Sequence, residues 1–97
     1  MSRVIRIRRT SKSSGRYFSL EAVCEIFDLP PRTVSLYERR GLIRAQWVET
    51  TQGRPRALFT PTEIRRLRRI LLLTKEMGVN IAGVEIILRL LEQLEAR

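Results

Sequence analysis

Two adjacent prolines, Pro30 and Pro31, constrain the fold of this chain more than any other feature. Each proline disfavours helical backbone at the residue before it, so a helix that approaches along the chain must end ahead of the pair. Pro31 in turn suits the first position of a following helix, where its missing N–H is not needed. The sequence therefore predicts two short helices joined by a turn of about three residues, which is a helix-turn-helix unit.

The residues on either side of the proline pair carry the signals of these two helices. Ser19 suits the N-cap of the first helix, and Glu21 follows in the first turn, where the helix dipole favours a negative charge. The apolar residues of this helix fall on one face at helical spacing: Leu20, Val23, Cys24 and Phe27. The second helix is expected to run from Pro31 to Arg40, because Gly41 is the residue type that commonly follows a helix end.

Residues 44–59 predict a β-hairpin after the two helices. Apolar and polar residues alternate weakly, with Trp47 and Val48 ahead of a turn and Leu58 and Phe59 after it. The tip between these runs holds turn-forming and basic residues: Gly53, Arg54, Pro55 and Arg56. A two-stranded ribbon with a basic tip that follows a helix-turn-helix is a wing.

Residues 60–63, with the sequence Thr-Pro-Thr-Glu, predict the start of a third helix. Thr60 suits the N-cap, Pro61 the first helical position, and Glu63 the far side of a capping box. The helix is expected to end near Gly78 and to bury one apolar face: Ile64, Leu67, Ile70, Leu71 and Leu73. The other side of the helix carries a row of arginines: Arg65, Arg66, Arg68 and Arg69. A solvated helix face and a phosphate-contacting face explain this row equally well.

A last amphipathic helix is expected behind a cap at Asn80. Its apolar residues recur at steps of three and four, and such a short helix is not stable alone, so the stripe must pack against the domain's own core or against a second copy. We favour the second copy, because the end of the stripe has little sequence left to cover it. The predicted dimer contacts are Val84, Ile87, Leu88, Leu91 and Leu94.

The charge distribution points to a polyanionic partner. The 97 residues include 19 Lys and Arg against 10 Asp and Glu, a net charge of +9. Residues 1–16 contain no acidic residue and are rich in Arg and Ser, which predicts a flexible basic arm. A soluble protein with a basic tail is the plainer alternative, and an organelle leader has a similar composition. Because each neutralised phosphate releases counterions, we favour nucleic acid.

Little in the sequence is suited to catalysis or to holding a cofactor. There is no histidine and a single cysteine, Cys24, so the chain lacks Cys–His pairs and the usual zinc clusters. Cys24 is interpreted as a small buried apolar residue. No apolar run reaches the roughly 18 residues of a membrane span. We therefore expect a non-enzymatic cytoplasmic protein with no metal, no cofactor, no membrane contact and no small-molecule effector domain.

Three motifs, in order along the chain, carry a family resemblance. The second helix and the residues after it contribute Pro31, Arg32, Thr33, Tyr37, Glu38, Gly41 and Leu42. Phe59 and Thr60 lead into the third helix, and residues 78–84 have the sequence Gly-Val-Asn-Ile-Ala-Gly-Val. Together these residues resemble the MerR family of transcription regulators, and the last segment resembles a subgroup, the heat-shock repressors of HspR type.

The resemblance implies a mainly α, winged helix-turn-helix fold with a short β-hairpin wing and a C-terminal dimerisation helix. It divides the chain into the basic arm (1–16), a DNA-binding domain (17–78) and the dimerisation helix (79–97). The second helix would enter the major groove of double-stranded DNA, and a homodimer would occupy a palindromic site. The residues expected to contact DNA are Arg32, Thr33, Ser35, Leu36, Tyr37, Arg39, Arg40, Arg54, Arg56 and Arg66. An HspR-like role would add a chaperone of the DnaK/DnaJ type as a partner.

Departures from the family pattern leave a second hypothesis open. Ser35 stands where the family usually has arginine, and Leu36 where it usually has an aromatic residue, at positions that face DNA in the family. Residues 78–83 also resemble the CbpM-type chaperone modulators, MerR-like proteins that bind the J-domain of a co-chaperone. A J-domain offers a basic helix and so calls for an acidic ligand, whereas this chain carries +9. We favour a dimeric DNA-binding regulator, with J-domain binding as the alternative.

Overall fold

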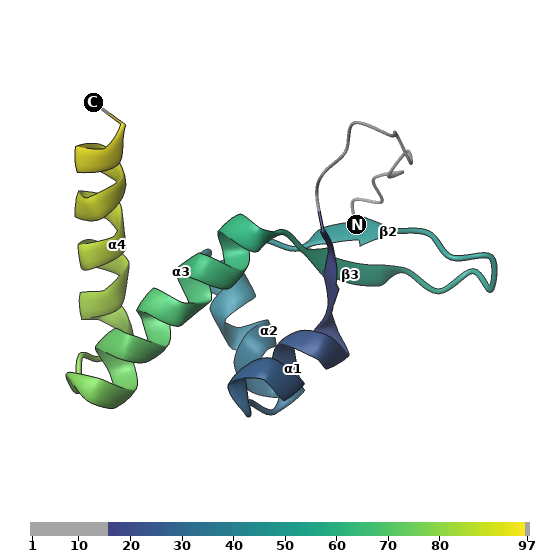
Figure 1. Cartoon of the computed structure of the whole chain (residues 1–97), viewed down its shortest axis with the longest axis horizontal. Coiled ribbons are helices and arrows are strands. Elements are labelled where there is room, and N and C mark those ends of the chain that lie inside the picture. Colours follow the sequence, from purple (N-terminus) through teal and green to yellow (C-terminus); the bar gives the residue numbers. More distant parts are fainter. Residues whose placement is uncertain (1–15, 97) are drawn as a thin grey trace.

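Four α-helices and a three-stranded antiparallel sheet make up the part of the chain that the computed structural model describes, residues 16–96 (Figure 1). The predicted basic arm lies outside the described residues, apart from Arg16. The elements in chain order are β1 (Phe18–Ser19), α1 (Leu20–Phe27), α2 (Pro31–Arg39), β2 (Gln46–Val48), β3 (Arg56–Phe59), α3 (Pro61–Leu71), a π-helical segment η1 (Leu72–Glu76) and α4 (Ile81–Glu95). This architecture confirms the predicted mainly α, winged helix-turn-helix fold.

The helix-turn-helix forms as the cap and proline signals predict. The Ser19 hydroxyl accepts a hydrogen bond from the Ala22 N–H at 3.1 Å and so caps α1. Asp28 ends α1 in the left-handed conformation, with a φ of 54°. Pro31 takes the first position of α2, and Gly41 follows that helix with a φ of +76°. Only residues 28–30 separate the two helices.

The wing forms as predicted from β2 and β3, but β3 also pairs on its other edge with a strand that the sequence does not predict. In this strand, β1, Phe18 lies opposite Phe59 and Ser19 opposite Leu58. Two residues are too few to show an alternating pattern, so sequence periodicity cannot reveal β1. Ser19 both ends β1 and caps α1, so the wing is joined to the helix-turn-helix without an intervening loop.

The start of α3 differs from the prediction in one respect. Thr60 and Pro61 occupy the N-cap and the first helical position, but the Thr60 side chain makes no capping hydrogen bond, and the predicted capping box is wrong. The Glu63 carboxylate instead accepts a hydrogen bond from the Arg44 N–H at 2.6 Å. This donor lies 19 positions away along the chain, so local capping rules cannot anticipate it. The bond joins α3 to the segment that follows α2.

The third helix ends near Gly78 as predicted, although its last turns widen into η1. The Met77 N–H donates to the Leu72 carbonyl at 3.1 Å, a bond that spans five residues. Gly78 then adopts a φ of +67° and redirects the chain. Asn80 caps α4 as predicted, because its side-chain oxygen accepts a hydrogen bond from the Gly83 N–H at 2.9 Å.

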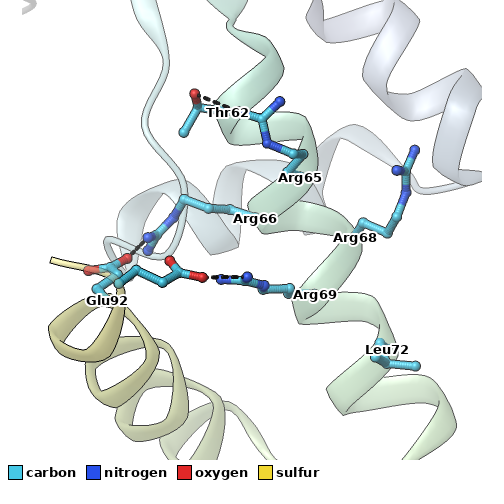
Figure 2. Close-up of a pocket in the computed structure, with 8 residues that line it drawn as sticks. Thr62, Arg65, Arg66, Arg68, Arg69, Leu72 and Glu92 are labelled. Atoms are coloured by element: carbon cyan, nitrogen blue, oxygen red, sulfur yellow. Dashed lines mark hydrogen bonds and ion pairs between the residues drawn. The ribbon is translucent and has the colours of Figure 1, made fainter. Parts of the chain in front are cut away.

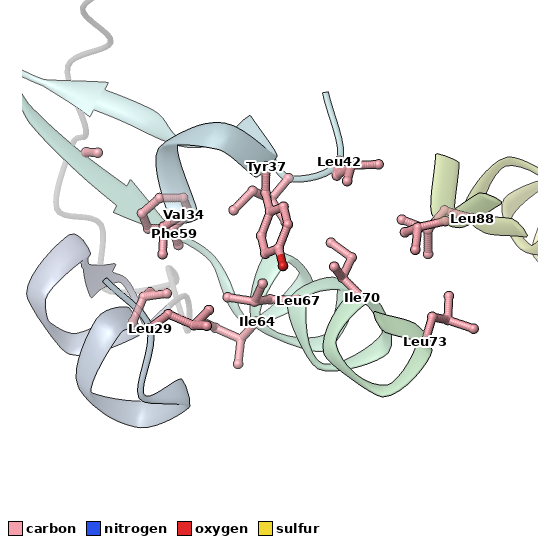
Figure 3. Packing of buried hydrophobic residues seen from close by; sticks show 14 residues of the cluster. Leu29, Val34, Tyr37, Leu42, Phe59, Ile64, Leu67, Ile70, Leu73 and Leu88 are labelled. Atoms are coloured by element: carbon pink, nitrogen blue, oxygen red, sulfur yellow. The ribbon is translucent and has the colours of Figure 1, made fainter. Parts of the chain in front are cut away.

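All four helices and the sheet contribute to one apolar core. Its most deeply buried large side chains are Phe59, Leu67, Ile70, Val23, Val34 and Val84. Of the five residues predicted to be buried on the third helix, Leu71 alone is only half-buried, although it packs against the core. Figure 3 shows that the side chains of α3 lie at the centre of this cluster.

Two of the predicted dimer contacts on α4 belong to this core instead. Val84 is 0% exposed and Leu88 is 3% exposed, and both lie in the same cluster as Ile70 and Leu73. Figure 3 shows Leu88 on the side of α4 that faces Ile70 and Leu73. An amphipathic pattern predicts that one face is covered but not by what, and here the chain's own core covers Val84 and Leu88. No helix within residues 16–96 is long and apolar enough to cross a membrane.

Candidate nucleic-acid interface

The outer face of α2 consists of four residues that share one side of the helix: Arg32, Ser35, Leu36 and Arg39. Three of the four side chains are exposed, and only Ser35 is half-buried. Val34 and Tyr37 point the opposite way and fix the rotation of α2, because both are buried in the core. The helix therefore presents two arginines, a hydroxyl and an aliphatic side chain to the outside.

Tyr37 is not part of this outer face, because its ring is buried. Its side chain is 6% exposed and packs in the core beside Leu67 and Ile70 (Figure 3). The helical period explains the difference, because Tyr37 follows Val34 by three residues and so shares the buried face of α2.

Thr33 and Arg40 flank the outer face of α2 and are less free than their neighbours. Thr33 is half-buried. The Arg40 guanidinium, at the end of α2, donates from Nε to a Glu85 oxygen of α4 at 2.9 Å. A carboxylate of the same chain therefore already binds one arginine that was predicted to contact DNA.

The wing carries two exposed arginines, Arg54 at its tip and Arg56 at the start of β3. Gly53 makes the tight turn with a φ of +78°, and the Thr50 hydroxyl donates to the Arg54 carbonyl at 2.8 Å. Arg56 lies 3.6 Å from a Glu21 oxygen of α1, and both side chains are largely exposed, so water and salt weaken this ion pair. Both wing arginines are accessible to a phosphate group.

A contact that sequence reasoning misses holds the wing against α2. The Trp47 indole N–H of β2 donates to a Glu38 oxygen of α2 at 3.1 Å, in a partly buried position. A half-buried indole N–H usually finds an acceptor, so the single tryptophan of the hairpin was the available signal. The pair fixes the position of β2 relative to the outer face of α2.

Comparison with known protein families matches residues 18–91 to the MerR HTH family regulatory proteins. The chain belongs to the MerR family. The match covers the helix-turn-helix, the wing, α3 and most of α4. No curated protein and no solved structure matches the chain. Membership confirms the family resemblance and makes the chain a DNA-binding regulatory protein.

This MerR-family chain has a second basic region on α3, and α4 neutralises part of it (Figure 2). Arg66 donates from Nε to the Leu42 carbonyl at 2.9 Å and pairs with Glu92 of α4, so it is engaged within the chain rather than free for DNA. Arg69 donates to Glu95 at 2.6 Å. This hydrogen bond and the charge of Arg69 hold the pKa of the Glu95 carboxyl below its ordinary value of 4.5, and the charge of Arg66 adds to the effect.

Cys24, the one thiol of the chain, is half-buried on α1. Burial raises the pKa of this thiol above its ordinary value of 9.0, and the nearby charge of Glu21 raises it further. The neutral thiol is therefore favoured, in agreement with its interpretation as a small apolar residue. Within residues 16–96, no three His, Cys, Asp or Glu side chains come together in a group that could hold a metal ion.

Proposed function

We propose that this MerR-family protein is a homodimeric transcriptional regulator that reads double-stranded DNA with the outer face of α2 and holds the phosphate backbone with its wing. The exposure of the outer face of α2 carries the proposal. Its two arginines, Arg32 and Arg39, have no carboxylate partner among residues 16–96, whereas four other arginines do. The two guanidinium groups therefore meet an incoming polyanion without first breaking an ion pair.

The residue types of the outer face fit the edges of base pairs in the major groove. An α-helix fits this groove, and an arginine fork matches the O6 and N7 acceptors of guanine. Leu36 suits the methyl group of thymine, and the Ser35 hydroxyl can donate or accept. Because only four side chains are available, we propose that few base pairs are read directly and that backbone contacts supply much of the affinity.

The wing contributes a contact of a different kind. Arg54 projects from an exposed tip and has no carboxylate partner among the described residues, which suits a phosphate group rather than a base edge. Neutralising one phosphate changes the slope of log affinity against log salt by about 0.9. Arg54→Ala should therefore weaken binding to all DNA sequences alike and reduce the salt slope by about one.

We place the dimer contact on the exposed side of α4, away from the core. This stripe consists of Ile86, Leu90 and Leu94, which are 56%, 53% and 64% exposed and recur every four residues. The predicted contacts Ile87 and Leu91 are half-buried, and Leu94 alone of the five predicted residues lies on the stripe itself. A second copy of α4 would cover these side chains, and a two-fold dimer would match a palindromic DNA site.

The dimer contact is tested with two neighbouring substitutions on α4. Leu90→Gln removes an apolar side chain from the stripe, and Arg89→Gln changes an exposed residue beside it. Burial of a leucine contributes about 1.5–3 kcal/mol, so Leu90→Gln should raise the dimer dissociation constant by about tenfold or more. Sedimentation velocity over a concentration series measures this. Equal dissociation of both variants would exclude the stripe as the dimer interface.

The segment that resembles HspR-type regulators has a clear role in folding. Gly78 supplies a positive φ, and Asn80 caps α4. A Cβ atom on Gly83 would approach Val79 Cγ1 to 2.7 Å, so glycine is the residue that fits there. These roles account for the segment without any partner, and we therefore rest the proposed function on α2 rather than on a chaperone.

The central experiment measures binding to the DNA upstream of the protein's own gene by fluorescence anisotropy at physiological salt. We expect the wild-type protein to bind this duplex at least about a thousandfold more tightly than a scrambled duplex of the same length. The paired variant Arg32→Ala/Arg39→Ala should lose this preference, while Arg89→Ala, an exposed arginine on α4, should keep it. Equal affinity of the wild-type protein for both duplexes would exclude sequence-specific regulation.

The alternative, binding to a J-domain, is addressed in the same preparation. A basic J-domain helix would face arginines on the outer face of α2 and on α3, so like charges oppose the complex. Titration of a purified J-domain at micromolar concentration should give no binding. A complex that forms there and is lost in Arg32→Ala/Arg39→Ala would favour the chaperone modulator over the regulator.

A further inference from the structure

The eleven residues of α3 carry four arginines, called here the arginine row: Arg65, Arg66, Arg68 and Arg69. Like charges three or four positions apart lie side by side on a helix and destabilise it. The row contains three such pairs, 65 with 68, 65 with 69 and 66 with 69. Such a concentration of charge opposes helix formation unless anions lie close to it.

The arginine row lines a groove between α3 and α4 with a volume of about 730 Å³ (Figure 2). Leu72 and the aliphatic stems of the arginines supply the apolar part of its wall. Glu92 and Glu95 reach into the groove from α4. Four arginines against two glutamates leave a net charge of +2 in the groove.

The two glutamates bind only half of the row. Arg66 pairs with Glu92 and Arg69 with Glu95. Arg65 donates only to the Thr62 hydroxyl, at 3.3 Å, and no carboxylate among residues 16–96 pairs with it or with Arg68. The groove therefore already binds two oxyanions and has guanidinium groups left for more.

The glutamates are weakly held ligands. Beyond Leu88, α4 buries no further side chain, and Leu91 is only half-buried. The side chains of Glu92 and Glu95 are 49% and 55% exposed, so water and dissolved ions weaken both ion pairs. An anion that carries several negative charges can therefore replace them.

We propose that the groove between α3 and α4 is a binding site for an oligophosphate, and that Glu92 and Glu95 occupy it as internal ligands until such an anion displaces them. Guanidinium forks match phosphate oxygens in geometry and charge, and a chain of phosphates spans several arginines at once. Displacement detaches the end of α4 from α3. Because this end carries Leu90 and Leu94 of the exposed stripe, the ligand also changes how α4 is presented to a second copy. The site itself does not depend on DNA binding by α2.

Tripolyphosphate is the probe, and sodium chloride at matched ionic strength is the reference. Isothermal titration calorimetry should show one tripolyphosphate per chain. Hydrogen exchange at residues 89–95 should quicken by at least about twofold over the chloride reference, because the end of α4 loses its ion pairs. A non-specific DNA duplex at equal phosphate concentration forms a second arm, since its backbone offers the same chemistry.

Two double variants with the same loss of charge locate the site. Arg65→Ala/Arg68→Ala removes the free half of the row and should weaken tripolyphosphate binding by about tenfold. Arg32→Ala/Arg39→Ala on α2 should leave this affinity unchanged. Glu92→Gln/Glu95→Gln should bind the probe about three to ten times more tightly, because the internal competitors are gone. All three carry substitutions at solvent-accessible side chains, and circular dichroism checks their folding.

Three results would overturn the proposal. The first is the absence of heat and of faster exchange with tripolyphosphate, including the case in which only the duplex releases α4. The second is an equal loss of tripolyphosphate affinity in the α2 and α3 double variants, which would mean that only total charge matters. The third is unchanged affinity in Glu92→Gln/Glu95→Gln. None of these outcomes bears on sequence-specific DNA binding, which the preference of the wild-type protein for its own upstream duplex tests separately.

Discussion

Both α2 and α3 carry exposed arginines, but the two helices differ in whether glutamates of the same chain pair with these arginines. Arg32 and Arg39 of α2 are exposed and have no carboxylate partner among residues 16–96. Arg66 and Arg69 of α3 are bound by glutamates of α4. Arg40 lies between the two cases, because it ends α2 and yet pairs with α4 through Glu85. The chain's own acids therefore decide which arginines meet an incoming anion without first breaking an ion pair.

The comparison also separates two kinds of helix docking. The core side of α2 is fixed by side chains that are almost fully buried, whereas the end of α4 is fixed by exposed ion pairs. Dissolved ions do not screen the burial of apolar surface, whereas they do screen exposed ion pairs. The position of α2 should therefore be insensitive to ionic strength, while the position of the end of α4 should respond to it.

The largest expected effect is on the anchor of α2. Tyr37→Ala removes a large side chain from the core and should lower the free energy of unfolding by about 3–5 kcal/mol, measured by urea denaturation. Tyr37→Phe keeps the ring and should retain most of the stability and the DNA affinity. If Tyr37→Ala kept its stability and lost only DNA binding, Tyr37 would belong to the DNA-contacting surface and the assignment of faces on α2 would be wrong.

The second prediction compares the effect of one arginine substitution on α2 with that of one on α3. Arg32→Ala should weaken binding to the specific duplex by about 1–3 kcal/mol if it forks onto a base, with no change in stability. Arg66→Ala should leave specific binding nearly intact and lower the free energy of unfolding by about 1 kcal/mol, because its bond to the Leu42 carbonyl is lost. Anisotropy and urea denaturation on both variants measure this, and equal losses of DNA affinity would remove the distinction between the helices.

The third prediction concerns the close packing where α4 begins. Gly83→Ala places a Cβ atom 2.7 Å from Val79 Cγ1 and should lower the free energy of unfolding by about 1 kcal/mol. In a Val79→Ala background the same change should be stabilising, because alanine favours helix over glycine by about 1 kcal/mol. Thermal denaturation of the wild-type protein, the two single variants and the double variant measures the change in stability in each background. Stabilisation by Gly83→Ala in the wild-type background would show that Val79 moves aside freely.

The smallest expected effect is a dependence of α4 on pH. Because the folded-state pKa of Glu95 lies below its ordinary value of 4.5, its pair with Arg69 contributes stability above that value. The contribution is lost as pH falls through the lowered pKa, and the end of α4 should then exchange its amides faster. Side-chain carboxyl NMR on the wild-type protein and on Arg69→Gln measures the titration. The Glu95 pKa should rise in the variant, and an unchanged value would exclude the ion pair in solution.

Local signals predict the elements of this fold well, and contacts between distant segments account for what they miss. The caps at Ser19 and Asn80 and the helix start at Pro31 each depend on residues within one helical turn. The partner of Glu63 is 19 positions away, and those of Arg66 and Arg69 are reached only once α4 packs beside α3. Rules based on local sequence spacing cannot predict these partners, because the partners lie far apart along the chain.

In the candidate interface, too, local sequence predicts some features and misses those that depend on distant segments. The helical period from Val34 is enough to place the Tyr37 ring inside, so its burial was predictable from the sequence. The engagement of Arg40 was not, because its partner Glu85 lies 45 positions further on. The burial of Val84 and Leu88 likewise depends on the direction in which the chain leaves Gly78.

The two-residue strand β1 has a consequence for the DNA rather than for the protein. Pairing of β1 with β3, and of Trp47 with Glu38, sets the separation of α2 and the wing tip before any duplex arrives. A duplex whose groove spacing differs must then bend or twist to meet both. Flexible base steps deform at the lowest energy, so we expect them to be preferred even where no side chain touches them. We therefore expect the protein to select its sites partly by the stiffness of the double helix.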